Sequence, residues 1–208
     1  MNFDRVAGIY RSLERLVFGG ALQRARVAHL DSLCGAPRVL VLGDGDGRFL
    51  ETLLERLPEA EVEVVEASPK MIALARQRVG TTPRVKFYQC RMEAFEPCGR
   101  YDLAVCHFFL DCLDPDGIEG VARVMSRCLV EDGKWLISDF QVPRRGILRR
   151  ARAKVLLWVM YRFFGLAANL ECRCLVDPEP LLDRAGFVLE GRVISNLGFL
   201  RADRWGCR

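Results

Sequence analysis

The sequence predicts an α/β protein built on a mostly parallel sheet of seven strands in which the last strand is antiparallel. Short runs rich in β-branched and aromatic residues alternate with helical patterns from residue 38 onward, which is typical of βαβ units. The last two runs are separated only by residues 195–198, so they form an antiparallel hairpin at the sheet edge. A length of 208 residues suits one domain of this class.

The strands and helices follow one another in a regular order. The expected strands are Arg38–Leu42, Val62–Glu66, Val85–Gln89, Tyr101–His107, Lys134–Phe140, Phe187–Ile194 and Phe199–Arg204. Apolar residues fall on one helical face at Phe49, Leu50, Leu53, Leu54 and Leu57, and again at Ile118, Val121, Met125 and Cys128. Ser68, Asp114 and Asp177 each precede a proline and are expected to cap a helix, and Gly186 is expected to end one.

Two helical segments lie outside this alternation, and both are candidates for a lid. Residues 1–33 are rich in Arg and Leu and lead into the first strand. The second segment follows the fifth strand, and its basic residues are Arg144, Arg145, Arg149, Arg150, Arg152 and Lys154. Such a helix either lies on a membrane surface, with Trp158 and its apolar neighbours in the interface, or presents a solvated basic face over an ordinary packed helix.

Composition excludes several classes of protein. Half of the residues are hydrophobic and 28% are charged, which rules out disordered, collagen-like and coiled-coil chains. The net charge of +4 is milder than nucleic-acid binders usually show, so no nucleic-acid partner is expected. Nine scattered cysteines and a start without the pattern of a signal peptide predict a reduced, cytoplasmic protein. No apolar run reaches the roughly 18 residues of a membrane span.

The most informative stretch is VLVLGDGDGRF, in which the first strand runs directly into Gly43, Gly45 and Gly47 and then into a helix. Glycines allow a tight turn and let the backbone approach a ligand closely. The spacing G-x-G-x-G differs from the dinucleotide fingerprint G-x-G-x-x-G, which would need a glycine at Arg48. Glu66, at the end of the second strand, stands where a carboxylate accepts hydrogen bonds from ribose hydroxyls.

These stretches are similar to the class I S-adenosylmethionine-dependent methyltransferases over about residues 38–204. VLVLGDGDG resembles the first motif of that family, VVEASPKMI its second and YDLAVCHFFLDCL its fourth, while DGKWLISDF and LLDRAGF resemble later segments. The resemblance implies a Rossmann-like three-layer fold and S-adenosylmethionine as cofactor. FDRVAGIY and the helical insertion look most like the small-molecule branch that includes the ubiquinone and menaquinone biosynthesis methyltransferases.

The resemblance also implies which residues hold the cofactor and how the single domain, 1–208, is divided. The cofactor residues are Gly43, Asp44, Gly45, Asp46, Gly47, Glu66, Ala67, Met71, Arg91, Met92, Glu93, Cys106 and His107. The parts are an N-terminal helical lid (1–33), a cofactor-binding core (34–143), a helical insertion (144–176) and the final helix with its hairpin (177–208). The chain departs from the family at Val41 and Arg91, where acids are usual, and Asp44 or Asp46 is the candidate substitute for the first.

Candidate catalytic residues are His107, Asp111 and Asp139, because ligands of open α/β sheets bind outside the carboxyl ends of the strands. His107 has an ordinary pKa suited to a general base, and its alternative role is a hydrogen-bonded residue of the cleft wall. Asp111 either orients His107 or the acceptor, or caps a helix at the cleft rim, and Asp139 has the same alternatives. No metal site is expected, since Cys172 and Cys174 lack a second pair or a nearby histidine.

The predicted reaction is methyl transfer to a small, hydrophobic or aromatic acceptor, with Phe108 and Phe109 either walling the acceptor or packing in the core. Two alternatives stay open at this point. One is methylation of RNA or protein, which the Arg-rich insertion supports. The other is a non-catalytic binding module that retains the fold, which the departures at Val41 and Arg91 support.

Overall fold

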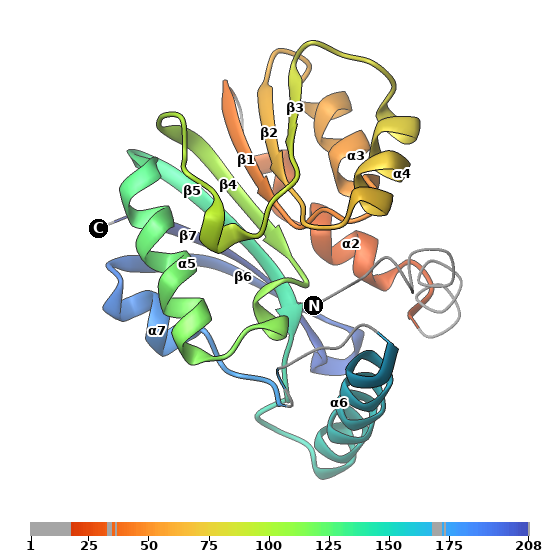
Figure 1. Ribbon diagram of the computed structural model, residues 1–208. Coiled ribbons are helices and arrows are strands. Elements are labelled where there is room, and N and C mark those ends of the chain that lie inside the picture. The colour runs from red at the N-terminus through yellow and green to blue at the C-terminus, as the bar shows by residue number, and fades with distance from the viewer. Residues whose placement is uncertain (1–17, 33–34, 36, 168–171, 173, 208) are drawn as a thin grey trace.

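A computed structural model describes residues 18–32, 35, 37–167, 172 and 174–207 of the chain. Its centre is a seven-stranded sheet in the order β3-β2-β1-β4-β5-β7-β6 (Figure 1). The strands are β1 (Arg38–Leu42), β2 (Glu61–Val65), β3 (Val85–Tyr88), β4 (Tyr101–His107), β5 (Leu129–Phe140), β6 (Phe187–Ser195) and β7 (Leu200–Cys207). Strands β1 to β5 pair in parallel, and β7 is antiparallel to both of its neighbours. The predicted fold class is confirmed.

Helices cover both faces of the sheet and make the three layers visible in Figure 1. They are α2 (Ala21–Val27), α3 (Arg48–Arg56), α4 (Pro69–Val79), α5 (Pro115–Cys128), α6 (Ile147–Ala167) and α7 (Glu179–Arg184). Val39, Val41 and Val105 point to the face that packs on Phe49 and Leu50 of α3. Alternate residues of the same strands point to the face covered by α5 and α7. This period of two places apolar side chains on both sides of a fully covered sheet.

Two of the three predicted helix caps form as expected. The Ser68 hydroxyl accepts a hydrogen bond from the Met71 N–H (3.1 Å), and the Asp114 carboxylate accepts one from the Gly117 N–H (2.8 Å). The prediction for Asp177 is wrong, because α7 begins at Glu179 and Pro178 occupies the N-cap. Asp177 instead accepts the Glu179 N–H (3.3 Å) and pairs with the Arg201 guanidinium (3.0 Å).

Strand β5 is longer than predicted. It begins at Leu129, immediately after α5, because Leu129 pairs with Tyr101 across a register shift in β4. The turn between β6 and β7 is a short 3-10 helix, Asn196–Gly198, as the hairpin requires. The C-terminal glycine of α7, Gly186, has a φ of 91°, which only glycine adopts without cost.

The insertion after β5 is the helix α6, and it docks beyond the carboxyl end of that strand. Ala153 and Leu157 of α6 are buried with Phe140, Phe199 and Leu22 in a third apolar cluster. Of the predicted N-terminal lid, residues 1–17 lie outside the described residues, and α2 is the part that the structure places. Within the described ranges, no helix is both long enough and apolar enough to cross a membrane.

Candidate functional site

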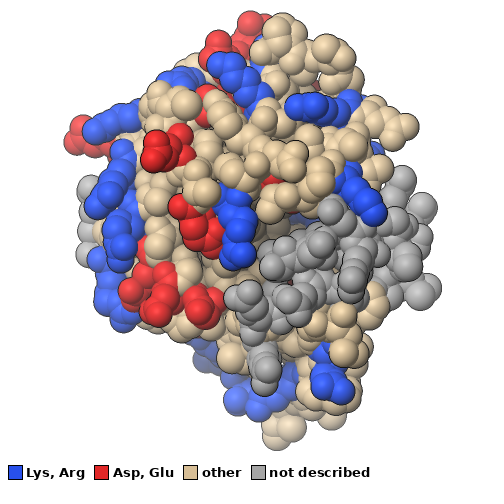
Figure 2. All heavy atoms as spheres, in the orientation of Figure 1, with Lys and Arg blue, Asp and Glu red and all other residues tan. Residues whose placement is uncertain are grey.

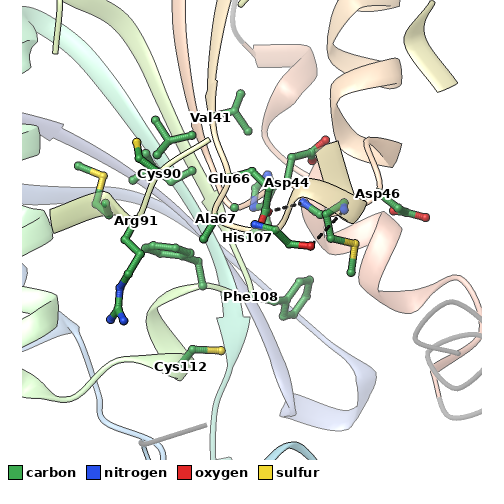
Figure 3. A pocket seen from close by; sticks show the side chains of 18 of the residues that line it. Val41, Asp44, Asp46, Glu66, Ala67, Cys90, Arg91, His107, Phe108 and Cys112 are labelled. Carbon is green, nitrogen blue, oxygen red and sulfur yellow. Dashed lines mark hydrogen bonds between the residues drawn. The ribbon is translucent and has the colours of Figure 1, made fainter. Parts of the chain in front are cut away.

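A cleft of about 410 Å³ opens at the carboxyl ends of β1, β2 and β4, where the strand order changes direction (Figure 3). From β1 the chain continues to β2 and β3 on one side, and then crosses to β4 on the other side of β1. The point between β1 and β4, where the strand order reverses, is where open α/β sheets bind ligands. The residues that line the cleft are Arg26, Val41, Leu42, Gly43, Asp44, Gly45, Asp46, Arg48, Val65, Glu66, Ala67, Ser68, Met71, Cys90, Arg91, Met92, Glu93, His107, Phe108, Phe109, Cys112 and Leu113.

The glycines of the turn after β1 have different surroundings. Gly43, Gly45 and Gly47 all have left-handed backbone, with φ of 65°, 67° and 82°. A Cβ at Gly47 would lie 2.7 Å from the Ala75 Cα, so this glycine allows α4 to approach the turn, and it is not a cleft-lining residue. A Cβ at Gly45 would meet no atom within 4 Å, because this residue faces the open cleft. Gly45 is therefore the position where bare backbone is offered to a ligand.

Glu66 connects the turns that follow β1 and β2. One carboxylate oxygen accepts the Gly45 N–H (3.3 Å) and the other accepts the Ser68 N–H (2.8 Å). The acid therefore holds both turns in register at the edge of the cleft. The side chain is only partly buried and lines the cleft, so its oxygens also face the space where a ligand would lie.

The two aspartates of the glycine turn have different environments. Asp46 pairs with the Arg48 Nε (2.9 Å) and with the Arg78 Nη2 (3.2 Å), so its charge is already compensated. Asp44 accepts the Leu50 N–H at the start of α3 (3.2 Å). Burial raises the pKa of Asp44 to about 7, although the Arg26 guanidinium and the Leu50 N–H both favour the carboxylate.

Arg26 was not predicted as a site residue. It belongs to α2, is 8% exposed and lies over the Phe108 ring with its guanidinium carbon 5.1 Å from the ring centroid. Its Nη1 donates to the Gln23 side chain (3.3 Å). No local pattern distinguishes this arginine from its neighbours in the Arg-rich N-terminal segment. Its place in the cleft comes from the docking of α2 on the sheet.

His107 ends β4 and lines the cleft as a neutral imidazole. It is 8% exposed, stacks edge-on against Phe49 at 4.5 Å, and neither ring nitrogen has a hydrogen-bond partner among the described residues. Burial, assisted by the Arg26 charge, holds the pKa of His107 well below its ordinary value. The next residue, Phe108, has a φ of 53°, which is rare for a residue other than glycine and is found at functional sites.

Asp111 and Asp139 are buried behind the cleft, and neither is among its lining residues. The Asp139 carboxylate accepts the Asp111 N–H (3.0 Å) and the Phe140 N–H (2.8 Å), which ties the short 3-10 helix Leu110–Cys112 to the end of β5. Burial raises the pKa of Asp111 to about 6, and burial together with the Asp111 charge raises that of Asp139 well above its ordinary value. Asp139 therefore holds the backbone that carries the cleft wall, whereas the Asp111 carboxylate accepts the thiol of Cys112, a cleft-lining residue (3.5 Å).

Of the other predicted site residues, Arg91 lies at the opposite end of the cleft from Asp46, as Figure 3 shows. Ala67, Met71, Arg91, Met92 and Glu93 line the cleft, whereas Cys106 is buried in the core of β4 and does not. Met92 is 7% exposed, and Arg91 pairs with Glu93 at 3.3 Å on the outer rim. Sequence reasoning missed Cys90, Cys112 and Leu113, which reach the cleft through the irregular segments after β3 and β4.

The described residues hold no group of three or more His, Cys, Asp or Glu side chains placed to bind a metal ion. Cys172, part of the Cys-x-Cys pair, is buried, and its thiol contacts the carbonyl oxygens of Cys174 (3.1 Å) and Leu113 (3.4 Å). The cysteine pair thus packs against the segment that leads into the cleft wall. The fold and the cleft together define a Rossmann-like protein whose site is shaped for a ligand held by a glycine turn and a strand-end acid.

Comparison with known proteins finds methyltransferases. A family model described as a methyltransferase domain matches residues 39–133, which include β1, the glycine turn, β2 and β4. The demethylmenaquinone methyltransferase of Thermus thermophilus is 32% identical over 149 residues, covering 69% of this chain and 66% of that protein. The trans-aconitate 2-methyltransferase of Acidovorax sp. is 34% identical over 167 residues, covering 72% and 61%. The matched region thus spans less than two thirds of each curated relative.

A solved structure with the same fold is the N-methyltransferase NodS of Bradyrhizobium japonicum in complex with S-adenosyl-L-homocysteine. It superposes with a TM-score of 0.64 at 15% identity, covering 98% of this chain and 89% of that one. The chain belongs to the class I S-adenosylmethionine-dependent methyltransferases. The expected family, read from the motif residues, is confirmed.

Proposed function

We propose that this protein transfers a methyl group from S-adenosylmethionine to a small apolar or aromatic acceptor. The observation that carries the proposal is the cleft itself. An exposed stretch of glycine backbone at Gly45 lies beside the Glu66 carboxylate, and the same cleft continues to a wall formed by His107, Phe108 and Leu113. One end thus offers polar backbone and an acid, and the other offers apolar side chains.

The residues at the donor end fit the cofactor. The space above Gly45 is one that a Cβ would enter without meeting protein, as expected where a ligand backs onto the main chain. Glu66 is placed to accept hydrogen bonds from ribose hydroxyls, and Ala67, Met71 and Met92 provide apolar surface for a base. S-adenosylmethionine supplies a methyl group already activated on a sulfonium, so the protein's main task is to position the reactants and exclude water.

The departure at Val41 is compensated by Asp44 in this proposal. Val41 is 1% exposed and packs in the core, so it presents no charge to an ammonium group. Asp44 lies three residues further along and lines the cleft, whereas Asp46 is held by Arg48 and Arg78. We assign Asp44 to the ammonium of the cofactor, because Asp46 is already paired with two arginines and a buried carboxylate gains most from a cationic partner.

At the acceptor end, His107 is the residue that can take a proton. Its depressed pKa keeps it neutral, so it does not repel a cationic cofactor, and the one ring nitrogen that carries no proton can accept from an acceptor O–H or N–H. Asp139 and Asp111 are positioning residues, because Asp139 holds the backbone of the 3-10 helix after β4 and Asp111 accepts the Cys112 thiol of the cleft wall. Phe108 and Leu113 provide apolar wall, and Phe108 sits next to the Arg26 guanidinium.

We also propose that the four predicted parts of the domain contribute to different ends of the cleft. The cofactor-binding core, 34–143, carries the donor end of the cleft, while the N-terminal part, 1–33, contributes Arg26. The insertion, 144–176, and the final helix with its hairpin, 177–208, support the acceptor end. A small-molecule acceptor suits a cleft of about 410 Å³ better than a nucleic acid does, and no nucleic-acid partner is proposed.

Calorimetry with S-adenosylmethionine and S-adenosyl-L-homocysteine tests the donor half. We expect both to bind with micromolar affinity. Incubation with isotopically labelled cofactor and a small-molecule extract of the host then tests the acceptor half, with label expected in an organic-soluble product. Cofactor binding with label found only in RNA or protein would contradict the acceptor class. Absence of binding at millimolar cofactor would favour a non-catalytic binding module.

A further inference from the structure

Helix α6 has two apolar faces. Its inner face, Ala153, Leu157, Met160 and Phe164, is spaced at three and four residues, and its first three members belong to or pack against the cluster shared with Phe140 and Phe199. An outer stripe of Leu148, Val155, Trp158, Val159 and Leu166 lies on the opposite side of the same helix, at the spacing that keeps side chains on one helical face.

The outer stripe is exposed. Leu148 is 85% exposed, Val155 61%, Trp158 67%, Val159 50% and Leu166 78%. An ordinary surface helix places polar residues on the side away from the core. Large apolar side chains gathered on that side, interrupted by the exposed Arg162, mark an interaction surface, because monomeric soluble proteins seldom expose such groups.

The charges around the outer stripe are all of one sign. Residues 141–170 contain no Asp or Glu but include seven basic residues, namely Arg144, Arg145, Arg149, Arg150, Arg152, Lys154 and Arg162. All seven are exposed, and Arg144 and Arg145 precede the start of α6 at Ile147. Figure 2 shows blue and tan spheres, and no red ones, at the lower end of the molecule where Figure 1 places α6.

This charge pattern decides between the two occupants that an apolar helix face can have. A second copy of the chain would bring another set of seven basic residues to the contact, without an acidic side chain in either segment to pair with them. Helix pairs of that kind usually carry opposite charges beside the apolar seam. An anionic lipid surface offers the complementary charge and accepts the apolar side chains at the same time.

We propose that α6 is a membrane-surface helix, which lies on anionic lipid with the outer stripe in the interface and its basic residues on the headgroups. The geometry of the site adds a consequence that rests on the proposed function. The Tyr161 hydroxyl of α6 donates to the Asp111 carbonyl oxygen (2.8 Å), and the next residues of that segment, Cys112 and Leu113, line the cleft. The acceptor wall therefore adjoins the lipid, and the acceptor class it suits is an amphiphile dissolved in the bilayer.

The three tryptophans make the contact measurable without any ligand. Trp135 and Trp205 are 0% and 1% exposed, so Trp158 is the tryptophan that senses the outside of the protein. The full-length protein is mixed with vesicles of phosphatidylcholine alone, or of equal parts phosphatidylcholine and phosphatidylglycerol. With the anionic vesicles we expect Trp158 emission to shift to shorter wavelength and to be quenched by brominated lipid. High salt should reverse most of the binding.

A matched pair of variants separates the contribution of the outer stripe from the general effect of adding a negative charge to the protein surface. Val155→Glu places a charge in the middle of the outer stripe, and we expect it to weaken vesicle binding by about tenfold or more. Leu74→Glu makes the same change in charge on α4, at a residue that is 37% exposed, and should leave vesicle binding unchanged. Circular dichroism of both variants checks that they are folded.

Three results would overturn the proposal. Unchanged Trp158 emission on anionic vesicles is the first, and equal binding of Val155→Glu and the unmodified protein is the second. The third is a dimer in sedimentation velocity, without lipid, that Val155→Glu dissociates, since the outer stripe would then be covered by a second copy. Because none of these measurements uses cofactor, they are independent of the calorimetric test of the proposed function. A lipid-soluble acceptor is supported only if the labelled product partitions into the vesicles.

Discussion

In the proposed function, the donor end and the acceptor end of the cleft recognise their ligands by different means. At the donor end the chain presents main-chain groups of the turn at Gly45, held in place by Glu66. At the acceptor end it presents side chains, of which His107 and Phe108 stand on a strained turn supported from behind by Asp139. A ligand common to a whole family can be held by backbone, whereas an acceptor that varies must be selected by side chains.

The largest expected effect separates the two ends through His107. If the imidazole accepts the proton of the acceptor, His107→Ala should lower turnover by about 10²–10⁴-fold and leave the cofactor dissociation constant unchanged. Rate and calorimetric measurements on one preparation check this. The matched control is His29→Ala, since the chain has 2 histidines and His29 contacts the Ala202 carbonyl oxygen away from the cleft. A near-normal rate for His107→Ala would show that His107 forms part of the cleft wall without accepting a proton.

Gly45→Val tests the donor end by filling the space above the turn. We expect a loss of cofactor affinity of about 100-fold or more, because a branched side chain would occupy the ligand's place and also resist the positive φ. Gly80→Val is a matched control, since Gly80 has a φ of 70° and likewise no atom within 4 Å of its Cβ position, but lies at the end of α4 outside the cleft. Equal cofactor affinity in the Gly45→Val and Gly80→Val variants would show that the glycine turn does not bind the cofactor.

Glu66→Ala should weaken cofactor binding by a smaller amount. Loss of the ribose contacts is worth roughly 1–3 kcal/mol, or about five- to 150-fold in the dissociation constant. Part of the loss comes from the two turns, since the Gly45 and Ser68 N–H groups lose their acceptor. Glu61→Ala, an exposed change on the same strand, is the control for stability. If both variants bind the cofactor like the unmodified protein, Glu66 has no role in holding the ribose.

The placement of the residues at the proposed donor end was predictable because its signal is local. A strand, a glycine turn and a strand-end acid occupy the short stretch from Val39 to Glu66, and their order alone places Gly45 beside Glu66. The sheet was predictable for the same reason, since each strand and its following helix are read from neighbouring residues. The predicted and observed strands differ only at their ends. An example is β5, which begins at Leu129 because that residue pairs with Tyr101.

The acceptor end was predicted less well because its contacts are between distant segments. Arg26 reaches the cleft only because α2 docks on the sheet, which no pattern around that residue indicates. Asp139 stands at a strand end, as a cleft residue would, but its carboxylate turns to the backbone N–H groups of Asp111 and Phe140. A strand position thus predicts which end of the sheet a side chain is near, and not which way that side chain turns.

Asp44 gives the donor end a dependence on pH that the glycine backbone cannot give. With a pKa of about 7 in the free protein, Asp44 is mostly protonated at pH 6 and mostly ionised at pH 8. Because an ammonium group binds the ionised form better, cofactor affinity should rise by about tenfold over that range. Calorimetry at several pH values measures this rise. Asp44→Asn should flatten it and Asp46→Asn should not, and a rise that survives Asp44→Asn would assign the linkage to another group.

The last expected effect concerns the stability of the free protein, to which both ends contribute. Asp44, Asp111 and Asp139 have pKa values above their ordinary 3.8, so the folded state holds more protons than the unfolded state at intermediate pH. Stability is therefore greatest below about pH 4 as far as these groups are concerned, and it falls as pH rises toward 7. Thermal unfolding followed by circular dichroism should show a melting temperature that falls over this window. Asp44→Asn should reduce the slope of the melting temperature against pH, because it removes the donor-end acid. An unchanged slope in that variant would show that Asp111 and Asp139, the acids behind the acceptor wall, dominate the pH dependence.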